Sequence, residues 1–184
     1  MVSTKAAAGV VNADMTDSYL ALNYGNRVDE YLIDTLEYNR KYTASEPIID
    51  LAYFRVADDQ DRMLLNLVTE NYRYKMIVGS TGGEYIGLGV TPLSINSNPN
   101  NVYAISSTNS NTFLEFTSLS YRVIEGTKSS ILAKYSYDGD YIIADYKQTE
   151  IGIWKDGNLI QKFNDWSNNI VDIGESEDIL AVID

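Results

Sequence analysis

The 184-residue sequence carries 26 acidic and 14 basic side chains, a net charge of −12 at pH 7. Phosphate backbones repel such an acidic chain, so we expect no nucleic-acid partner. Cysteine and histidine are both absent, which excludes disulfides, thiolate nucleophiles, the usual general base and most transition-metal sites. We therefore expect no metal and no cofactor.

The first 17 residues contain one lysine and a short run of small residues. That run is too short and too mildly apolar for a signal peptide, and no stretch is long enough for a transmembrane helix. We expect no membrane insertion, and we interpret residues 1–17 as a tail or a first strand of the mature protein. The localisation stays open between the cytoplasm and the surface of a virion or cell.

Residues 26–42 fit two different structures. As a helix, the segment has a cap at Asn26, one apolar face, and acidic side chains ahead of basic ones. As a hairpin, it has strands at 30–34 and 36–39, between neighbours that also read as strands. We favour the hairpin. The helix leaves open an alternative fold, a β-sandwich with one helix at 26–42.

The middle of the chain alternates strand-like runs with turn residues. An apolar run at 47–55 predicts a buried strand, followed by an acidic turn at 58–61. Residues 92–101 are rich in asparagine and serine and resemble a linker. Further strands are predicted at 19–24, 63–68, 73–78, 85–90, 102–106, 113–117 and 121–124.

Residues 129–166 show the clearest pattern, four short strands joined by three turns. Asp-Gly pairs at 138–139 and 156–157 supply the positive φ angles that tight hairpins need, and the second pair predicts a type I′ turn. Trp154 ends an alternating strand, so we expect its side chain to be buried between neighbouring sheets. The four strands are predicted at 131–135, 141–144, 151–154 and 159–163.

Two motifs lie within this segment. Tyr-Ser-x-Asp-Gly occupies 135–139, and Ile-x-Ile-Trp-Lys-Asp-Gly occupies 151–157. Together they resemble one blade of a WD-repeat type β-propeller, and the resemblance is best over residues 129–184. The chain departs from that pattern because it has no Gly-His pair and has Trp-Lys in place of Trp-Asp. The resemblance implies an all-β, β-propeller-like fold of antiparallel four-stranded units whose loops and faces bind other proteins.

Polar turns that end at residues 17, 61, 111, 140 and 178 recur at about the 40-residue period of such blades. We interpret each turn as the connection between the first and second strands of a unit, with a shortened third unit. We expect 1–184 to form a single all-β domain, an incomplete propeller or part of a larger assembly. Its last strand, at 179–183, is predicted to pair with residues 6–12 or with another subunit.

Carboxylates, hydroxyls and lysines are the groups left for catalysis. Asp50 and Asp172 lie inside apolar strands, and two such acids at a set distance could hydrolyse a glycoside. An ion pair or exposure at an edge is the simpler explanation of each. The acidic run at 58–61 lacks the ligand spacing of a calcium loop, and the glycine-rich 79–83 lacks the lysine of a phosphate loop. We interpret both as ordinary turns.

Tyrosine is frequent, at 15 residues. Some of these rings could form a sugar-stacking or protein-binding face, although such residues more often simply cover a sheet. The tyrosines considered for this face are Tyr72, Tyr74, Tyr135, Tyr137, Tyr141 and Tyr146.

Three functions are consistent with the sequence. The favoured one is a non-catalytic protein-interaction or scaffold module, with no catalytic, cofactor-binding or metal-binding residue assigned. The second is a structural subunit of a virion, filament or cell surface that assembles by strand pairing. The third is a carboxylate-dependent glycoside-active enzyme. For the first two, the expected partners are other proteins or copies of the chain itself, bound through edge strands.

Overall fold

A computed structural model of the chain describes residues 8–56, 62–78, 83–97, 104–108, 112–117, 120–125, 133–136, 140–145, 150–164, 170, 172–176 and 179–183. These residues contain strands, turns and bridges and no helix, so the expected all-β class is confirmed. Within them, nothing is helical, long and apolar enough to cross a membrane.

Four sheets have four antiparallel strands each, and their strands are neighbours in sequence order. The first sheet contains β1 (Asn12–Met15), β2 (Tyr19–Asn23), β3 (Arg27–Leu32) and β4 (Tyr38–Thr43). The second contains β5 (Ile48–Arg55), β6 (Met63–Thr69), β7 (Tyr72–Ile77) and β8 (Gly83–Gly87). The third contains β9 (Asn96–Ser97), β10 (Ala104–Ser107), β11 (Thr112–Phe116) and β12 (Tyr121–Glu125). The fourth contains β13 (Ala133–Tyr135), β14 (Ile142–Asp145), β15 (Ile151–Lys155) and β16 (Asn158–Phe163).

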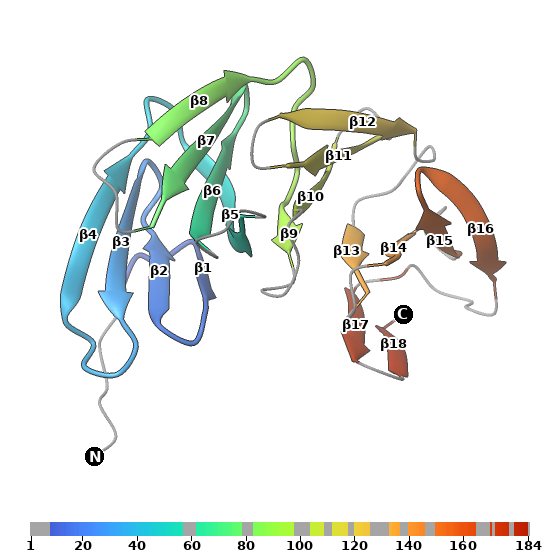
Figure 1. Ribbon diagram of the computed structural model, residues 1–184, viewed down its shortest axis with the longest axis horizontal. Helices are drawn as coiled ribbons and strands as arrows, with labels where there is room; N and C mark the ends of the chain where they lie inside the picture. The colour runs from blue at the N-terminus through green and yellow to red at the C-terminus, as the bar shows by residue number, and fades with distance from the viewer. Residues whose placement is uncertain are drawn as a thin grey trace.

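The sheets follow one another in chain order, and Figure 1 shows them from the first at the left to the fourth at the right. The first strands of successive sheets contact one another, β1 with β5, β5 with β9, and β9 with β13. A fifth sheet of two strands, β17 (Asp172–Ser176) and β18 (Ile179–Ile183), completes the series. The first strands therefore form one edge of an arc, and the fourth strands form the other.

An apolar cluster fills the space between each pair of neighbouring sheets, because alternate residues of a strand point to opposite faces. Each cluster combines side chains from two sheets, so burial of these residues holds the arc together. From the first junction to the fourth, representative members are Val28 with Leu67, Phe54 with Phe116, Phe113 with Trp154, and Ile151 with Ile173.

Trp154 is 2% exposed and lies between the third and fourth sheets, as predicted. Its indole meets the ring of Phe113 edge to face, with centroids 5.4 Å apart. Gly152 lies two residues earlier on the same face of β15, and a methyl group there would overlap the indole. The glycine therefore leaves the space that the tryptophan fills.

The segment 26–42 is the predicted hairpin, and the alternative helix is wrong. Strands β3 and β4 pair from Arg27 with Thr43 to Tyr31 with Tyr38. The register shifts between Glu30 and Tyr31, because the pairing skips Asn39 and β4 therefore has one extra residue at this point. Burial of Val28, Tyr31 and Tyr42 against neighbouring strands outweighs the local helix signal.

The third sheet differs from the expected repeat. Its first strand, Asn96–Ser97, lies inside the segment interpreted as a linker. The turn ending at 111 therefore precedes the third strand, Thr112–Phe116, and not the second. A strand of two polar residues shows no alternation, so sequence periodicity could not locate it.

The turn after β15 has the predicted conformation. Asp156 and Gly157 both have positive φ angles, 51° and 80°, as a type I′ turn requires. Residues 137–139, which contain the other Asp-Gly pair, lie outside the described part of the chain, as do 57–61. The predictions for those two turns stay predictions.

Strand β18 pairs with β17 from Ile179 with Ser176 to Ile183 with Asp172. Among the described residues, Val11 and Asn12 bond to Asn23 and extend β1, so they are not the partner of β18. Figure 1 also places β1 and β18 in different parts of the arc. Pairing of β18 with another subunit stays a prediction.

Candidate functional site

A tyrosine and a glutamate link the first sheet to the second. The Tyr53 hydroxyl on β5 donates a hydrogen bond to Glu30 Oε2 on β3, at 2.8 Å. Glu30 also accepts from Asn39 Nδ2, at 2.7 Å, and from the hydroxyl of Tyr42, at 3.4 Å. The carboxylate is fully buried, and its recorded hydrogen-bond donors are all uncharged.

The same link recurs between the third and fourth sheets. The Tyr135 hydroxyl on β13 donates to Glu115 Oε1 on β11. Arg122 on β12 donates from Nε to the other oxygen, Oε2, of the same carboxylate. Glu115 is 5% exposed, whereas the side chain of Arg122 is 57% exposed. Here a cation at the surface holds a buried carboxylate.

Three of the sheets have a pair of oppositely charged side chains at the same position, opposite each other on the third and fourth strands. Glu30 is opposite Arg40, Lys75 is opposite Glu84, and Glu115 is opposite Arg122, always on the third and fourth strands. In the second sheet the signs are exchanged, and Lys75 Nζ lies 2.6 Å from Glu84. Because residues opposite each other point to the same face, each pair lies at the junction with the next sheet.

The junction between the second and third sheets is held by a buried arginine. Arg73 Nε donates to Asn66 Oδ1 at 2.6 Å, while Nη1 and Nη2 donate to the carbonyl oxygens of Ser120 and Thr117 at 3.0 and 2.8 Å. The guanidinium also lies over the ring of Phe116, 4.7 Å from its centroid. Burial lowers the pKa of Arg73 to about 10.

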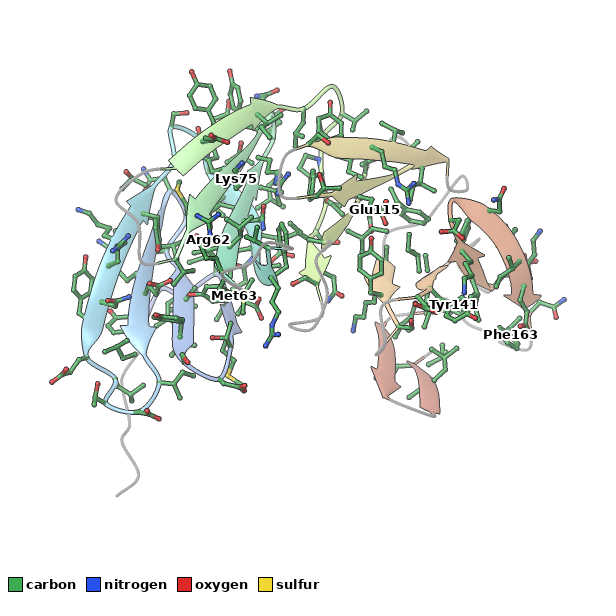
Figure 2. The ribbon with its side chains drawn as sticks, in the orientation of Figure 1. Arg62, Met63, Lys75, Glu115, Tyr141 and Phe163 are labelled. Atoms are coloured by element: carbon green, nitrogen blue, oxygen red, sulfur yellow. The ribbon has the colours of Figure 1, made fainter. Side chains whose placement is uncertain are left out.

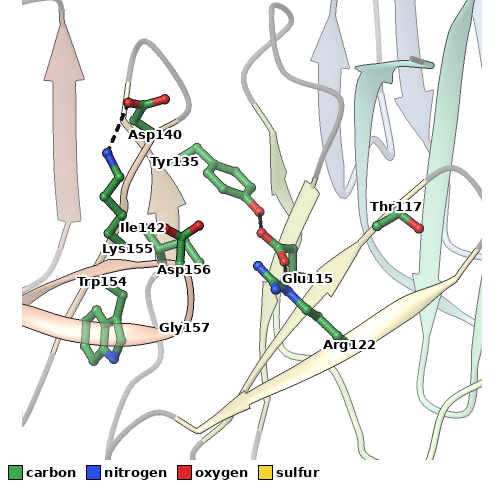
Figure 3. Close-up of a pocket in the computed structure, with 10 residues that line it drawn as sticks. All are labelled: Glu115, Thr117, Arg122, Tyr135, Asp140, Ile142, Trp154, Lys155, Asp156 and Gly157. Atoms are coloured by element: carbon green, nitrogen blue, oxygen red, sulfur yellow. Dashed lines mark hydrogen bonds and ion pairs between the residues drawn. The ribbon is translucent and has the colours of Figure 1, made fainter. Parts of the chain in front are cut away.

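A cavity of about 510 Å³ opens beside Glu115, between the third and fourth sheets. This volume lies within the usual range for ligand sites, about 300–1,000 Å³. Figure 3 shows Tyr135, Glu115 and Arg122 along one side of the cavity and Lys155 and Asp140 along the other. Its wall consists of Glu115, Thr117, Arg122, Tyr135, Asp140, Ile142, Trp154, Lys155, Asp156 and Gly157.

The far side of the cavity comes from the two turns of the fourth sheet. Lys155 Nζ lies 3.4 Å from Asp140 Oδ2 and 4.7 Å from the ring centre of Tyr141. Its interactions with Tyr141 first, and then with Asp140, raise the pKa of Lys155. Figure 2 shows Tyr141 on the fourth sheet, across the junction from Glu115 on the third. The wall of the cavity therefore contains both acidic and basic groups.

Comparison with known proteins adds one finding about the fold. Neither protein-family models nor curated proteins match the sequence. Among solved structures, the crystal structure of the β-propeller domain of Cps50 (Swd1) from Myceliophteria thermophila superposes with a TM-score of 0.76 at 12% identity. The match covers 99% of this chain and 64% of that one, so the chain spans less than two thirds of the matched protein.

The fold is β-propeller-like. Each four-stranded sheet corresponds to a blade, and the first strands correspond to the inner ring that propeller blades place around their axis. This agreement confirms the expected fold. At 12% identity the likeness concerns the fold alone.

Asp50 bridges two blades. Its Oδ1 and Oδ2 accept the backbone N–H groups of Leu51 and Ile95, both at 2.9 Å, and burial raises its pKa. Asp14 on β1 also links two blades, because its carboxylate accepts the N–H of Tyr53 on β5 at 2.8 Å. The side chain of Asp172 lies outside the described part, and its strand, β17, is separated from β5 by two complete blades. The described residues thus give Asp50 a structural role.

The predicted tyrosine face divides into separate groups. Tyr135 is buried at the junction of blades 3 and 4, and Tyr141 lies beneath Lys155. Tyr72 and Tyr74 contact Tyr85, 70% exposed, at centroid distances of 5.7 and 6.2 Å. Tyr137 and Tyr146 lie outside the described residues.

Sequence analysis missed Glu115 and Arg122, which build the cavity together with the tyrosine candidate Tyr135. Glu115 and Arg122 belong to neighbouring strands, and Tyr135 comes 20 positions after Glu115. One local signal was available, because a single glutamate within the apolar run 113–116 implies a buried charge that needs a partner. The sequence did not identify that partner.

Proposed function

We propose that this chain is a non-catalytic scaffold module that binds another protein at the junction of blades 3 and 4. The observation that supports it most directly is the cavity beside Glu115, which lies at the ends of β11, β13 and β15, where loops of two blades meet. In propellers, sites formed by loops on a rigid set of blades are suited to binding.

The chemistry of the described residues also favours binding over catalysis. General acid and base catalysis needs groups that exchange protons with a substrate. Glu115 is engaged by Tyr135 and Arg122, and both oxygens of Asp50 accept backbone N–H groups. These carboxylates connect blades and are held in place by their donors.

Site-specific photocross-linking tests this function. A benzoylphenylalanine at Asn158, exposed and next to the turn at the cavity, is expected to cross-link one defined protein in cells that naturally carry this chain. The same group at Lys41, exposed on the outer strand β4 of blade 1, is the control. Mass spectrometry should identify the same partner peptide repeatedly at Asn158 and not at Lys41. Equal adducts at both positions, or none at Asn158, would reject the proposal.

A second candidate function, self-assembly by strand pairing, rests on β18. In the described part of the chain this strand has β17 as its one hydrogen-bonded neighbour, and Ile183 is 59% exposed. An apolar strand with an available edge can accept a strand from another molecule. Light scattering across a concentration series should then show oligomers that deletion of residues 178–184 abolishes. A monomer at every concentration argues against this candidate.

A further inference from the structure

The junctions after blades 1 and 3 contain the same kinds of side chain, but the buried glutamate accepts hydrogen bonds from different donors in each. Each has a glutamate on the third strand, an arginine opposite it on the fourth, and a tyrosine on the next blade. Glu30 accepts from a second tyrosine, Tyr42, two residues beyond Arg40. The residue two beyond Arg122 is Ile124, which cannot donate.

Glu115 consequently depends on a cation where Glu30 uses neutral donors. The cation that serves it, the guanidinium of Arg122, belongs to a side chain that is more than half exposed. Once it leaves Glu115, the guanidinium of Arg122 can be solvated by water, because most of that side chain is already exposed. A second guanidinium that enters the cavity can therefore replace Arg122 on Glu115 at small cost.

The remaining wall suits such a ligand. Three acids, Glu115, Asp140 and Asp156, face two bases, and the whole chain carries a charge of −12. Asp156 has no ion pair recorded among the described residues, and it lies at the tip of the exposed β15–β16 turn. Trp154 and Tyr135 line the cavity but are only 2% and 3% exposed, so its carboxylates and not an aromatic face select the ligand. The paired N–H donors of a planar guanidinium match a carboxylate better than a lysine ammonium does.

From this arrangement we propose that the cavity binds an arginine side chain of the partner protein, which displaces Arg122 from Glu115 and also pairs with Asp156. This inference rests on the proposed scaffold function and names the chemistry that the partner presents. Arg122 acts as the internal substitute for that arginine while the site is free. Charge complementarity between an acidic chain and a basic segment then directs the encounter.

Tryptophan fluorescence provides the test, because Trp154 lines the cavity and Trp166 can be replaced by phenylalanine. The probe is the blocked peptide acetyl-Ala-Arg-Ala-amide, and its neutral counterpart contains citrulline. We expect a saturable fluorescence change with the arginine peptide and binding at least about tenfold weaker with citrulline, since a buried carboxylate loses its charged partner. Equal binding of the two peptides would overturn the inference.

Four variants locate the site. Arg122→Gln keeps a neutral donor for Glu115 and should tighten binding about threefold to fivefold, because it removes the competing cation. Arg40→Gln, its counterpart in blade 1, should change nothing. Glu115→Gln should weaken binding more than about tenfold. Asp156→Asn, which the left-handed turn accepts, should weaken it several-fold with the fold intact. Unchanged binding in folded Asp156→Asn, or no gain in Arg122→Gln, contradicts the proposal.

Three further outcomes separate the possibilities. Free arginine that binds as tightly as the peptide would show that the ligand is a small molecule and would overturn the assignment to a protein partner. If no arginine peptide binds while the cross-link at Asn158 persists, the scaffold function stands and the arginine inference fails. If the peptide binds and no cross-link forms, the site chemistry is supported and the scaffold function fails.

Discussion

The hydroxyl of Tyr53 on blade 2 donates a 2.8 Å hydrogen bond to the buried carboxylate of Glu30 on blade 1. Tyr135 on blade 4 makes the equivalent bond to Glu115 on blade 3. In both cases the glutamate is on the third strand of one blade and the tyrosine on the first strand of the next. Two of the blade junctions are thus joined in the same way, and the described residues of the junction between them use Arg73.

Removal of the Tyr53 hydroxyl should destabilise the fold. Tyr53→Phe keeps the ring but removes a donor from a buried carboxylate, so we expect a loss of about 1.5 to 3 kcal/mol in the free energy of unfolding. Urea denaturation measures it. Tyr74→Phe is the matched control, because its hydroxyl bonds to exposed Ser45 at 2.8 Å and should contribute well under that amount. Equal losses in the two variants would assign no special role to the Glu30 contact.

Arg73 should be as important to stability as an apolar core residue. Arg73→Met fills similar space but leaves two carbonyl oxygens and Asn66 without their donor, so we expect a loss of about 3 kcal/mol. Arg27→Met is the control, since the side chain of Arg27 is 46% exposed and its recorded ion pair is with Asp29, 3.1 Å away. That change should cost under about 1 kcal/mol. A stability of Arg73→Met close to that of the parent protein would contradict this assignment.

The indole of Trp154 and the missing side chain of Gly152 should behave as one packing unit. Trp154→Ala is expected to cost about 3 to 5 kcal/mol because it empties the junction of blades 3 and 4. Gly152→Ala should cost about 1 to 3 kcal/mol, since its methyl group would overlap the indole. In the double variant Gly152→Ala with Trp154→Ala, the cost of the methyl group should disappear. Additive losses, measured by thermal unfolding, would show that the two sites are independent.

Stability should fall between about pH 10 and pH 12. Burial first, and then the neighbouring Glu30 carboxylate, raise the pKa of Tyr42 to about 12, whereas a tyrosine of the unfolded chain ionises near pH 10. Between these values the folded state binds more protons than the unfolded state, so the free energy of unfolding decreases as the pH rises. The stabilisation is complete below pH 10. Tyr42→Phe should flatten this decline, and an unchanged slope in chemical denaturation at pH 9 to 12 would exclude Tyr42 as its source.

Local patterns in the sequence were sufficient for much of the fold. Short apolar runs bounded by turn residues located strands such as Ile48–Arg55 and Ile179–Ile183, because such runs are a local property of each strand. The pair Asp156-Gly157 specified a tight turn, since few residues accept positive φ angles. The alternating pattern at 151–154 predicted the burial of Trp154.

Tertiary structure alone decided the remainder. Asn96–Ser97 is a strand because it lies beside β10 and the neighbouring first strands, and no property of the two residues requires it. The choice between the favoured hairpin and the alternative helix at 26–42 also depended on tertiary structure, because apolar side chains of the hairpin are buried against strands that are distant in sequence.

The candidate site depends most on the assembled blades. Glu115 and Arg122 are opposite each other on two strands of blade 3, and Tyr135 reaches Glu115 because blades 3 and 4 lie face to face. The cavity beside them is the space that the two sheets leave between their loops. The sequence by itself determined most of the strands and the turn at 156–157, since those preferences act over a few residues. Which charged side chains meet across a junction was decided by the packing of whole sheets, whose geometry no short stretch of sequence contains.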